Sequence, residues 1–175
     1  MIGKILLAAD GSLNADRAAD IAAELASRLS ADLFIVHVMM HGRPSDELVR
    51  MAEVEHLVKE AYTTVSPGIA YVTGSHPDVL GAKATDPRFL SIISELGEQI
   101  VKRAKLRCAK QGAKNIKTSV RSGDYADEIL GAATAFKADM IVVGSRGLGV
   151  ITRTVLGSVS QKVLHNAQCS VLTVR

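Results

Sequence analysis

The chain has 175 residues, of which 47% are apolar and 22% are charged. This balance is typical of one soluble globular domain, long enough to bury a core without a disulfide or metal, and it excludes a disordered or fibrous chain. Aromatic residues make up only 3%, so we expect an aliphatic core, and the net charge of +3 is compatible with an anionic partner without identifying one.

Apolar patterns predict two strands and a helix in the first forty residues. The runs Lys4–Ala9 and Asp32–Val38 are almost continuously apolar, as in parallel strands that are covered on both faces. Between them, apolar residues recur at helical spacing over Ala15–Leu29. Asp16 and Asp20 lie towards the start of this helix, where the helix dipole favours acidic residues.

Residues 41–87 form an insertion between the second strand and its helix. Pro44-Ser45-Asp46-Glu47 has the composition of a helix start, and an apolar stripe continues to Ala61. Residues 66–87 are rich in proline and glycine, which indicates an irregular loop. A mobile decoration and a lid over a site are both compatible with this pattern. We expect the insertion to be dispensable for folding, because the strands and main helices form a complete sheet without it.

The rest of the chain alternates helices with strands. A helix is expected from Pro87, followed by helices over Ala126–Phe136 and Gly157–Asn166. The remaining strands are expected at Ile116–Arg121, Asp139–Gly144 and Ser170–Val174. Polar residues alternate with apolar ones in the first of these three strands, which is typical of an edge strand. The alternation predicts an α/β fold with a parallel sheet and helices on both faces, in one domain over residues 1–175.

Residues 102–121 contain eight basic residues and no acidic one. A nucleic-acid surface and the solvated face of a helix would both have this charge. Apolar residues recur at helical spacing from Ile93 to Cys108, and most of the neighbouring charges lie off that stripe. No aromatic residue interleaves with the charges to stack on bases. We therefore interpret the stretch as a solvated helix face and expect no nucleic-acid partner.

The sequence indicates a cytoplasmic protein without a membrane partner. The first apolar run ends at Asp10, too early for a signal peptide, and no run approaches the ~18 residues that a bilayer requires. The cysteines, Cys108 and Cys169, form no CxxC pair. Free thiols are typical of a reducing compartment.

The candidate site lies beyond the carboxyl ends of the strands, where open parallel sheets bind ligands. A glycine-rich loop begins at Gly144, and the Gly157-Ser158-Val159-Ser160 segment opens the next helix. Glycines allow close backbone approach, and a helix N-terminus offers free amides and a positive dipole end, so we expect phosphate there. The loop is not a Walker A motif, because Val150-Ile151 follows Gly149, and Thr152 interrupts a dinucleotide fingerprint.

The spacing Gly144-x2-Gly147-x9-Gly157-Ser158 resembles the G-x2-G-x9-G-[ST] motif of universal stress proteins, in their ATP-binding branch. The resemblance extends over Ile5–Val38 and Ser119–Val174, whereas the insertion departs from the family pattern. It implies an adenine nucleotide alpha hydrolase-like fold, a five-stranded parallel sheet of order 3-2-1-4-5 with ATP across the ends of strands one and four. It also implies a homodimer through the edge strand 170–174.

The same resemblance implies which residues bind the nucleotide. Val38 would contact adenine through its backbone, Asp10 would lie near the base and ribose, and Arg146 would be a flexible electrostatic contact. The glycine-rich loop would follow the ribose and α-phosphate, and the start of the last helix would surround the phosphates. The implied residues are Ala9, Asp10, Val38, Gly144, Ser145, Arg146, Gly147, Gly157, Ser158, Val159 and Ser160. Asp10 would also share Mg²⁺ with the triphosphate.

Other interpretations stay open for individual residues. Asp10 could form an Asx turn that caps the following helix, and Gly157-Ser158 could be only a helix start. His37, inside an apolar strand, is expected to be a hydrogen-bonded core residue, with a metal site shared with His41 as the alternative.

We expect an ATP-binding regulator of stress or signalling rather than an enzyme. The loops contain no phosphate-binding lysine and no general base beside the phosphates, so hydrolysis would be slow at most. The alternatives are a nucleotide-hydrolysing or adenylating α/β enzyme and a structural dimer that binds no nucleotide. The first would have a denser glycine-serine loop than the one at Asp10-Gly11-Ser12, and the intact glycine spacing argues against the second.

Overall fold

The computed structural model describes residues 1–39, 87–147 and 156–175. The predicted insertion 41–87 lies outside these residues except for Pro87, and so do its expected helix and irregular loop. His41 and Gly149 also lie outside the described residues.

The strands of the described residues form one parallel sheet in the order β3-β2-β1-β4-β5, which confirms the predicted fold class and strand order. At the centre, Leu7 lies opposite Ile35 on one side and Val142 on the other. Because all strands run the same way, their carboxyl ends meet at one edge. The strands are β1 (Lys4–Ala8), β2 (Asp32–Met39), β3 (Ile116–Ser122), β4 (Met140–Gly144) and β5 (Ser170–Val174).

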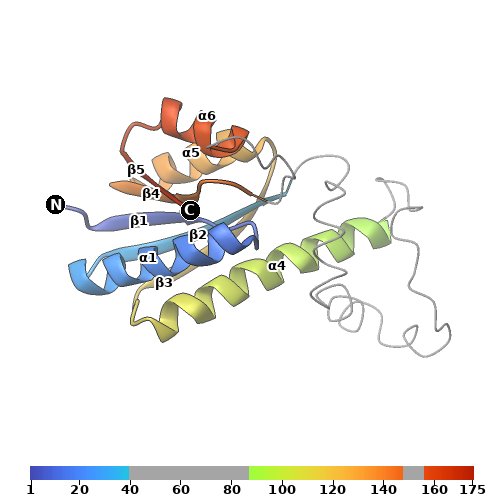
Figure 1. Ribbon diagram of the computed structural model, residues 1–175. Coiled ribbons are helices and arrows are strands. Elements are labelled where there is room, and N and C mark those ends of the chain that lie inside the picture. Colours follow the sequence, from blue (N-terminus) through green and yellow to red (C-terminus); the bar gives the residue numbers. More distant parts are fainter. Residues whose placement is uncertain (40–86, 148–155) are drawn as a thin grey trace.

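Helices cover both faces of the sheet, as expected. In the described residues, α1 (Leu13–Leu29) and α4 (Pro87–Lys110) lie on one face, and α5 (Tyr125–Phe136) and α6 (Ser158–Asn166) on the other (Figure 1). Helix α4 begins at Pro87, the predicted position. None of the helices described is long and apolar enough to cross a membrane.

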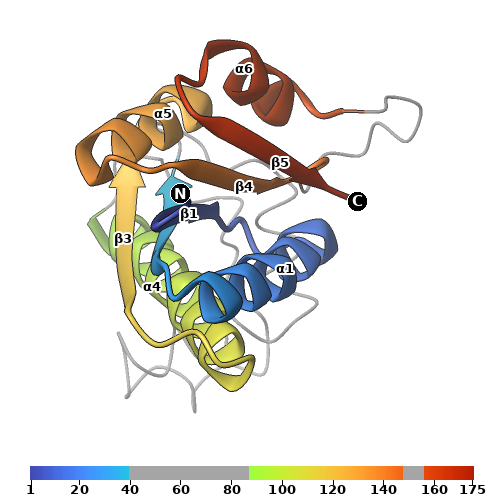
Figure 2. The same ribbon diagram turned by 90° about the vertical axis from the view of Figure 1, so that its left-hand side faces the viewer.

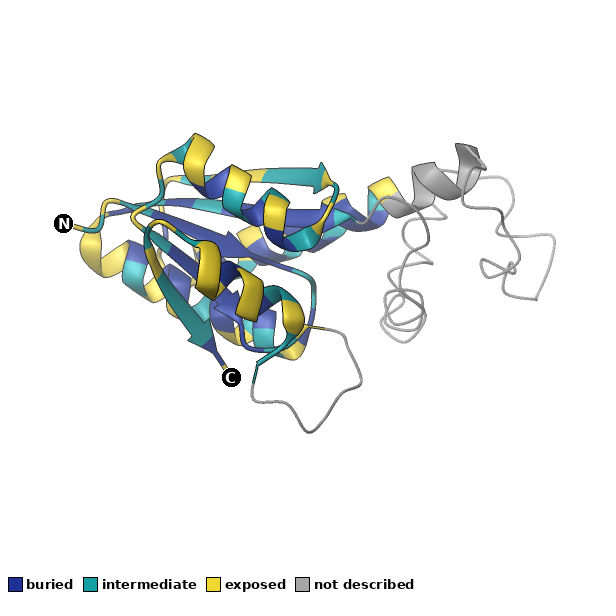
Figure 3. Ribbon diagram, turned by 90° about the horizontal axis from the view of Figure 1, so that it is seen from above, coloured by how far each residue is buried: buried dark blue, intermediate teal, exposed yellow. Residues whose placement is uncertain are grey.

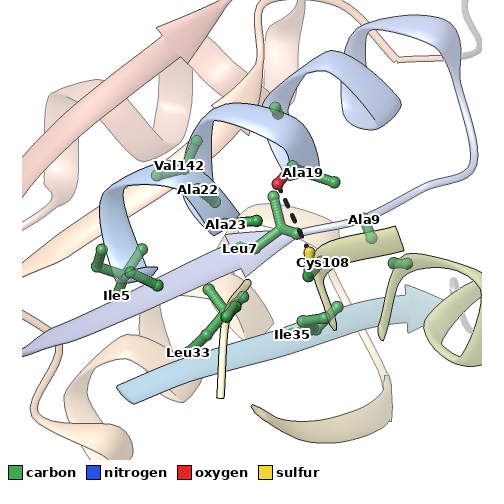
Figure 4. Close-up of a cluster of buried hydrophobic side chains, with 14 of the residues drawn as sticks. Ile5, Leu7, Ala9, Ala19, Ala22, Ala23, Leu33, Ile35, Cys108 and Val142 are labelled. Atoms are coloured by element: carbon green, nitrogen blue, oxygen red, sulfur yellow. Dashed lines mark hydrogen bonds between the residues drawn. The ribbon is translucent and has the colours of Figure 1, made fainter. Parts of the chain in front are cut away.

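Helix α1 packs close to the sheet because its inward face consists of alanine. The buried residues of the helix are Ala15, Ala18, Ala19, Ala22, Ala23 and Ala26. All of these except Ala15 share a core cluster with the fully buried Ile5, Leu7 and Ile35, and Figure 4 shows Ala19, Ala22 and Ala23 beside those side chains. The core is therefore aliphatic, as the composition predicts.

Helix α4 buries the predicted stripe from Leu96 onwards, and the side chain of Ile93, where the stripe was expected to begin, lies outside the described residues. Leu96, Ile100, Ala104 and Cys108 are buried, and the Cys108 thiol donates to the Ala19 carbonyl at 3.5 Å (Figure 4). Lys102, Lys105 and Lys110 are exposed, as expected for a solvated face.

Arg103 and Arg107 instead cross to acidic residues of α1. Arg107 holds both carboxylate oxygens of Asp20, at 2.6 and 2.7 Å, and Arg103 contacts Asp16 at 2.9 Å. The Arg107 guanidinium lowers the pKa of Asp20, and Asp20 in turn raises the pKa of Arg107. The two arginine side chains remain 41% and 38% exposed, so they stay on the solvated face while also pairing with α1, which a one-dimensional pattern does not show.

The edges of the sheet differ in character. At one edge, β3 turns Ile116 and Val120 towards the α1–α4 core and exposes Lys117, which confirms the predicted edge strand. At the other edge lies β5, beside β4 (Figure 2). Val171 and Leu172 of this strand are only half-buried, and Figure 3 shows which segments of the ribbon are buried and which are exposed. The second edge carries no charged residue, and a charge on an edge strand is one of the features that discourage pairing with another strand.

Candidate functional site

The carboxyl ends of β1 and β4 and the start of α6 come together at one edge of the sheet. The Asn14 side chain, in the first turn of α1, donates to the Arg146 carbonyl after β4 at 3.4 Å. The Gly157 amide, before α6, donates to the Ser145 carbonyl at 2.7 Å. Segments separated by more than 130 residues are thus joined into a single surface, as the predicted topology requires.

The turn after β1 is held by Asp10 and Ser12. One carboxylate oxygen of Asp10 accepts from the Ser12 amide at 2.9 Å, which is the Asx turn considered above. Gly11 has a φ of 82°, a left-handed conformation that favours glycine. The helix cap itself is Ser12, whose hydroxyl accepts from the Ala15 amide at 3.1 Å. Asp10 therefore shapes the turn and leaves its second carboxylate oxygen directed elsewhere.

That second oxygen faces the loop after β4. A Cβ atom on Gly147 would lie 2.6 Å from Asp10 Oδ2, so only glycine fits beside the carboxylate as it stands. A Cβ on Gly144 would lie 3.1 Å from backbone and Cβ atoms of Asn14 and from the Ala15 amide nitrogen. Gly144 is thus required by backbone atoms of α1, and Gly147 is required to leave the Asp10 carboxylate in its present position.

Gly157, the third glycine of the motif, has no atom of the described residues close enough to exclude a side chain. A Cβ there would meet Arg146 Cα and the Ser145 carbonyl at 3.5 Å, which are ordinary contacts. Its φ of −73° and ψ of 159° are accessible to any residue. The protein's own packing therefore does not explain why this position is glycine.

The N-terminus of α6 has no side-chain cap. Gly157 is the N-cap residue and makes no side-chain hydrogen bond, and the next three amides, of Ser158, Val159 and Ser160, have no intrahelical partner by position. The Ser158 side chain is exposed beside them. Among the described residues, this helix start therefore offers several donors and a positive dipole end at one place.

Ser160 has a different surrounding from Ser158. It is buried, and its hydroxyl lies 2.9 Å from both the Ser145 and the Gly157 carbonyl oxygens. A hydroxyl has one hydrogen to donate, and the one of Ser160 is directed at these two carbonyl oxygens. Ser160 therefore fixes the loop after β4 to the start of α6, and only its backbone amide is left for a ligand.

At the end of β2, the backbone of Val38 is directed towards this edge. The Val36 carbonyl accepts from Ala9 on the β1 side at 2.9 Å, and the Met39 carbonyl accepts from Gly123 on the β3 side at 2.9 Å. Because consecutive residues of a strand point to opposite neighbours, the amide and carbonyl of Val38 point towards β1. The Val38 backbone faces the position where β1 has ended.

His37 is a hydrogen-bonded core residue, as expected. It is 2% exposed, its Nδ1 lies 2.8 Å from the Ala9 carbonyl oxygen, and burial lowers its pKa. In the described ranges, no three His, Cys, Asp or Glu side chains gather to hold a metal ion.

Sequence reasoning missed Asn14. It joins the start of α1 to the loop after β4, through its bond to Arg146 and its closeness to Gly144. Its position one residue after the start of α1 would have been the available signal. Ser145 was expected at the ribose, and the structure buries it with its amide bonded to the Val174 carbonyl at 2.6 Å.

Comparison with known proteins identifies the family of the chain. The chain matches the universal stress protein family over residues 1–175. It is 34% identical to the universal stress protein YxiE of Bacillus subtilis over 177 residues, covering 100% of both chains.

Solved structures show the same fold. A universal stress protein in complex with cAMP has a TM-score of 0.61 and 21% identity, over 99% of this chain and 97% of that one. The universal stress protein of Archaeoglobus fulgidus in complex with dAMP has a TM-score of 0.60 and 19% identity, over 100% of this chain and 98% of that one. The family match, the YxiE identity and the shared fold lead to one conclusion: this chain belongs to the universal stress protein family.

Proposed function

We propose that this universal stress protein binds ATP with Mg²⁺ and acts as a nucleotide-dependent regulator of stress or signalling. The observation that carries the proposal is the uncapped N-terminus of α6. Its amides and the exposed Ser158 converge where the fold leaves room beside Gly157. Phosphate is the group for which such a helix start is suited, because the amides donate and the dipole favours negative charge.

The adenine end of the ligand is assigned to Val38. Its backbone offers a donor and an acceptor side by side, which complement a ring nitrogen and an amino group. Two proteins of the same fold are described with cAMP and with dAMP, both adenine nucleotides. The nucleotide would lie with its base at the end of β2 and its phosphates at α6.

Magnesium would be shared between the triphosphate and Asp10. One oxygen of Asp10 is engaged in the turn, and the second is directed towards Gly147, at the expected path of the phosphates. Carboxylate oxygens are the ligands that Mg²⁺ prefers. Arg146 is half-buried beside this path and would add a positive charge. One carboxylate and one arginine support binding, with slow hydrolysis at most.

The protein is also proposed to be a cytoplasmic homodimer through β5. The strand lies at the edge of the sheet with Val171 and Leu172 half-buried, so a second copy would complete both its hydrogen bonds and its apolar contacts. Cys108 and Cys169 are free thiols, which suits the reducing cytoplasm. Sedimentation equilibrium should report a dimer at micromolar concentration, and a monomer throughout would refute this assembly.

Calorimetric titration with Mg·ATP tests the nucleotide site directly. Gly157→Val should keep the fold, because the new side chain starts from ordinary contact distances, but its branched carbon would cover the donors of α6. Losing two charge-assisted hydrogen bonds costs about 3–6 kcal/mol, so affinity should fall by on the order of a hundredfold or more.

The matched control is Gly131→Val, a glycine on the exposed face of α5 where a Cβ approaches only Arg121, at 3.8 Å. Its affinity should equal that of the unmodified protein. Ser158→Ala should lose less affinity than Gly157→Val, because the amide remains. Unchanged affinity in folded Gly157→Val would refute the proposed site.

A further inference from the structure

The last carbonyl group of β1 is hydrogen-bonded to a side chain instead of to the neighbouring strand. The Ala9 amide donates to the Val36 carbonyl at 2.9 Å, continuing the pairing between β1 and β2 by one residue. In a parallel ladder the next bond would run from the Val38 amide to the Ala9 carbonyl. The acceptor is occupied instead by His37 Nδ1, at 2.8 Å.

Because the Ala9 carbonyl bonds to His37, the Val38 amide at the end of β2 is left without a backbone acceptor in the part of the chain that the structure describes. Within the described residues, the Ala9 carbonyl takes its bond from the imidazole and not from Val38. The Val38 amide points to the same side as Val36, towards β1, and so it faces the site as a free donor. A carbonyl oxygen has two lone pairs, so the imidazole competes for the Ala9 carbonyl rather than filling it, and without that competitor the ladder bond would use the Val38 donor.

The surroundings of His37 hold the ring in this role. The side chain is 2% exposed, and it packs against Gly97 of α4, where a Cβ would lie 3.2 Å from His37 Cδ2 and 3.1 Å from Val120 Cγ1. The absence of a side chain at Gly97 therefore leaves the space that the imidazole fills. Burial lowers the pKa of His37, so the ring is neutral at neutral pH, and its bond to a carbonyl places the hydrogen on Nδ1.

We propose that His37 is a positioning residue of the nucleotide site: by competing for the Ala9 carbonyl, it keeps the Val38 amide available to the adenine ring. This inference rests on the proposed function. Adenine presents a ring-nitrogen acceptor beside an amino donor, whereas guanine presents a donor beside a carbonyl. A free amide at Val38 therefore favours adenine, and His37 contributes to the choice of base without touching it.

The test compares His37→Leu, which removes the donor and keeps a side chain of similar size, with His37→Asn, which keeps a donor near the position of Nδ1. Mg·ATP affinity should fall about tenfold in His37→Leu, the value of one hydrogen bond, and should recover largely in His37→Asn. Affinity for inorganic tripolyphosphate, which has no base, should be equal in all three proteins. Equal ATP affinity in His37→Leu and the unmodified protein would overturn the inference.

A second measurement needs no nucleotide, and its first comparison is made within the unmodified protein. In the nucleotide-free protein, hydrogen exchange followed by NMR should find the Val38 amide much less protected than that of Val36, which lies inside the β1–β2 ladder. In His37→Leu the Val38 amide should become protected. Equal protection of the two amides in the unmodified protein would overturn the inference, even if His37→Leu does not fold. Failure of the unmodified protein to bind ATP would instead refute the proposed function and leave this measurement valid.

Discussion

Replacing Gly144 by alanine should destabilise the protein through α1. The added Cβ would lie 3.1 Å from the Asn14 carbonyl carbon, the Asn14 Cβ and the Ala15 amide nitrogen. Two of these three atoms belong to the backbone of a capped first turn, so they cannot rotate away. Overpacking of this kind costs about 1–3 kcal/mol. The smaller conformational freedom of alanine in the unfolded chain offsets about 0.4–1 kcal/mol of that cost.

The net destabilisation should therefore be about 1–2 kcal/mol, or a decrease in Tm of about 2–8 °C for a domain of this size. Urea unfolding followed by circular dichroism measures it. Gly131→Ala is the control, because its Cβ meets only a side-chain atom at 3.8 Å within a helix. That variant should be more stable than the unmodified protein by up to about 1 kcal/mol. If Gly144→Ala is as stable as Gly131→Ala, close packing of α1 is not what requires glycine after β4.

Three further changes test individual contacts. Asp20→Asn should remove about 1 kcal/mol of stability at pH 7, since the pair with Arg107 is about one-third exposed. Arg107 lowers the folded-state pKa of Asp20, so this contribution to stability is present above the unfolded-state pKa near 4 and is lost as the pH falls through the folded-state pKa. Urea unfolding should therefore find Asp20→Asn less stable than the unmodified protein at pH 7 and equally stable at pH 2. Burial raises the pKa of Cys108 to about 12, so iodoacetamide should modify it only in unfolded protein, as mass spectrometry would report. Gly147→Ala should displace the Asp10 carboxylate and so weaken Mg·ATP binding, measured by calorimetry. Its stability should change little, since the contact at 2.6 Å is with the end of a side chain. Unchanged affinity would show that Asp10 is not part of the proposed metal site.

The central strands could be predicted from the sequence because a strand buried on both faces needs apolar residues at nearly every position. Lys4–Ala8 and Met140–Gly144 lie at the centre of the sheet, and their apolar runs have no alternation to interpret. The end of β2 was harder to predict. Met39 extends the strand because it pairs with Ser122 and accepts a hydrogen bond from Gly123 of the neighbouring segment. A strand end depends on its partner, which no local pattern contains.

The sequence predicted which loops form the site, but not which hydrogen bonds the individual side chains of those loops make. Asp10 and Ser12 are both residue types that cap helices, and their order in the sequence does not decide which one does so. The structure assigns the cap to Ser12 and the turn to Asp10. Ser158 and Ser160 likewise look equivalent in sequence, yet one is exposed and the other is buried with its hydroxyl engaged. Such differences arise from neighbours that are distant along the chain.

The three glycines of the motif have different physical causes, and this difference is informative about the ligand. Gly144 is required by the backbone of the first turn of α1, so it would be needed in a protein that bound nothing, whereas Gly147 lies against the Asp10 carboxylate, which a side chain there would displace. Gly157 has room for a side chain and an ordinary backbone conformation, and glycine is no better than serine or aspartate as an N-cap. A residue with a capping side chain would occupy the amides of α6 and stabilise the isolated protein. Glycine at this position keeps those amides free at a cost in stability, which is the arrangement expected where an external anion, the proposed triphosphate, serves as the cap.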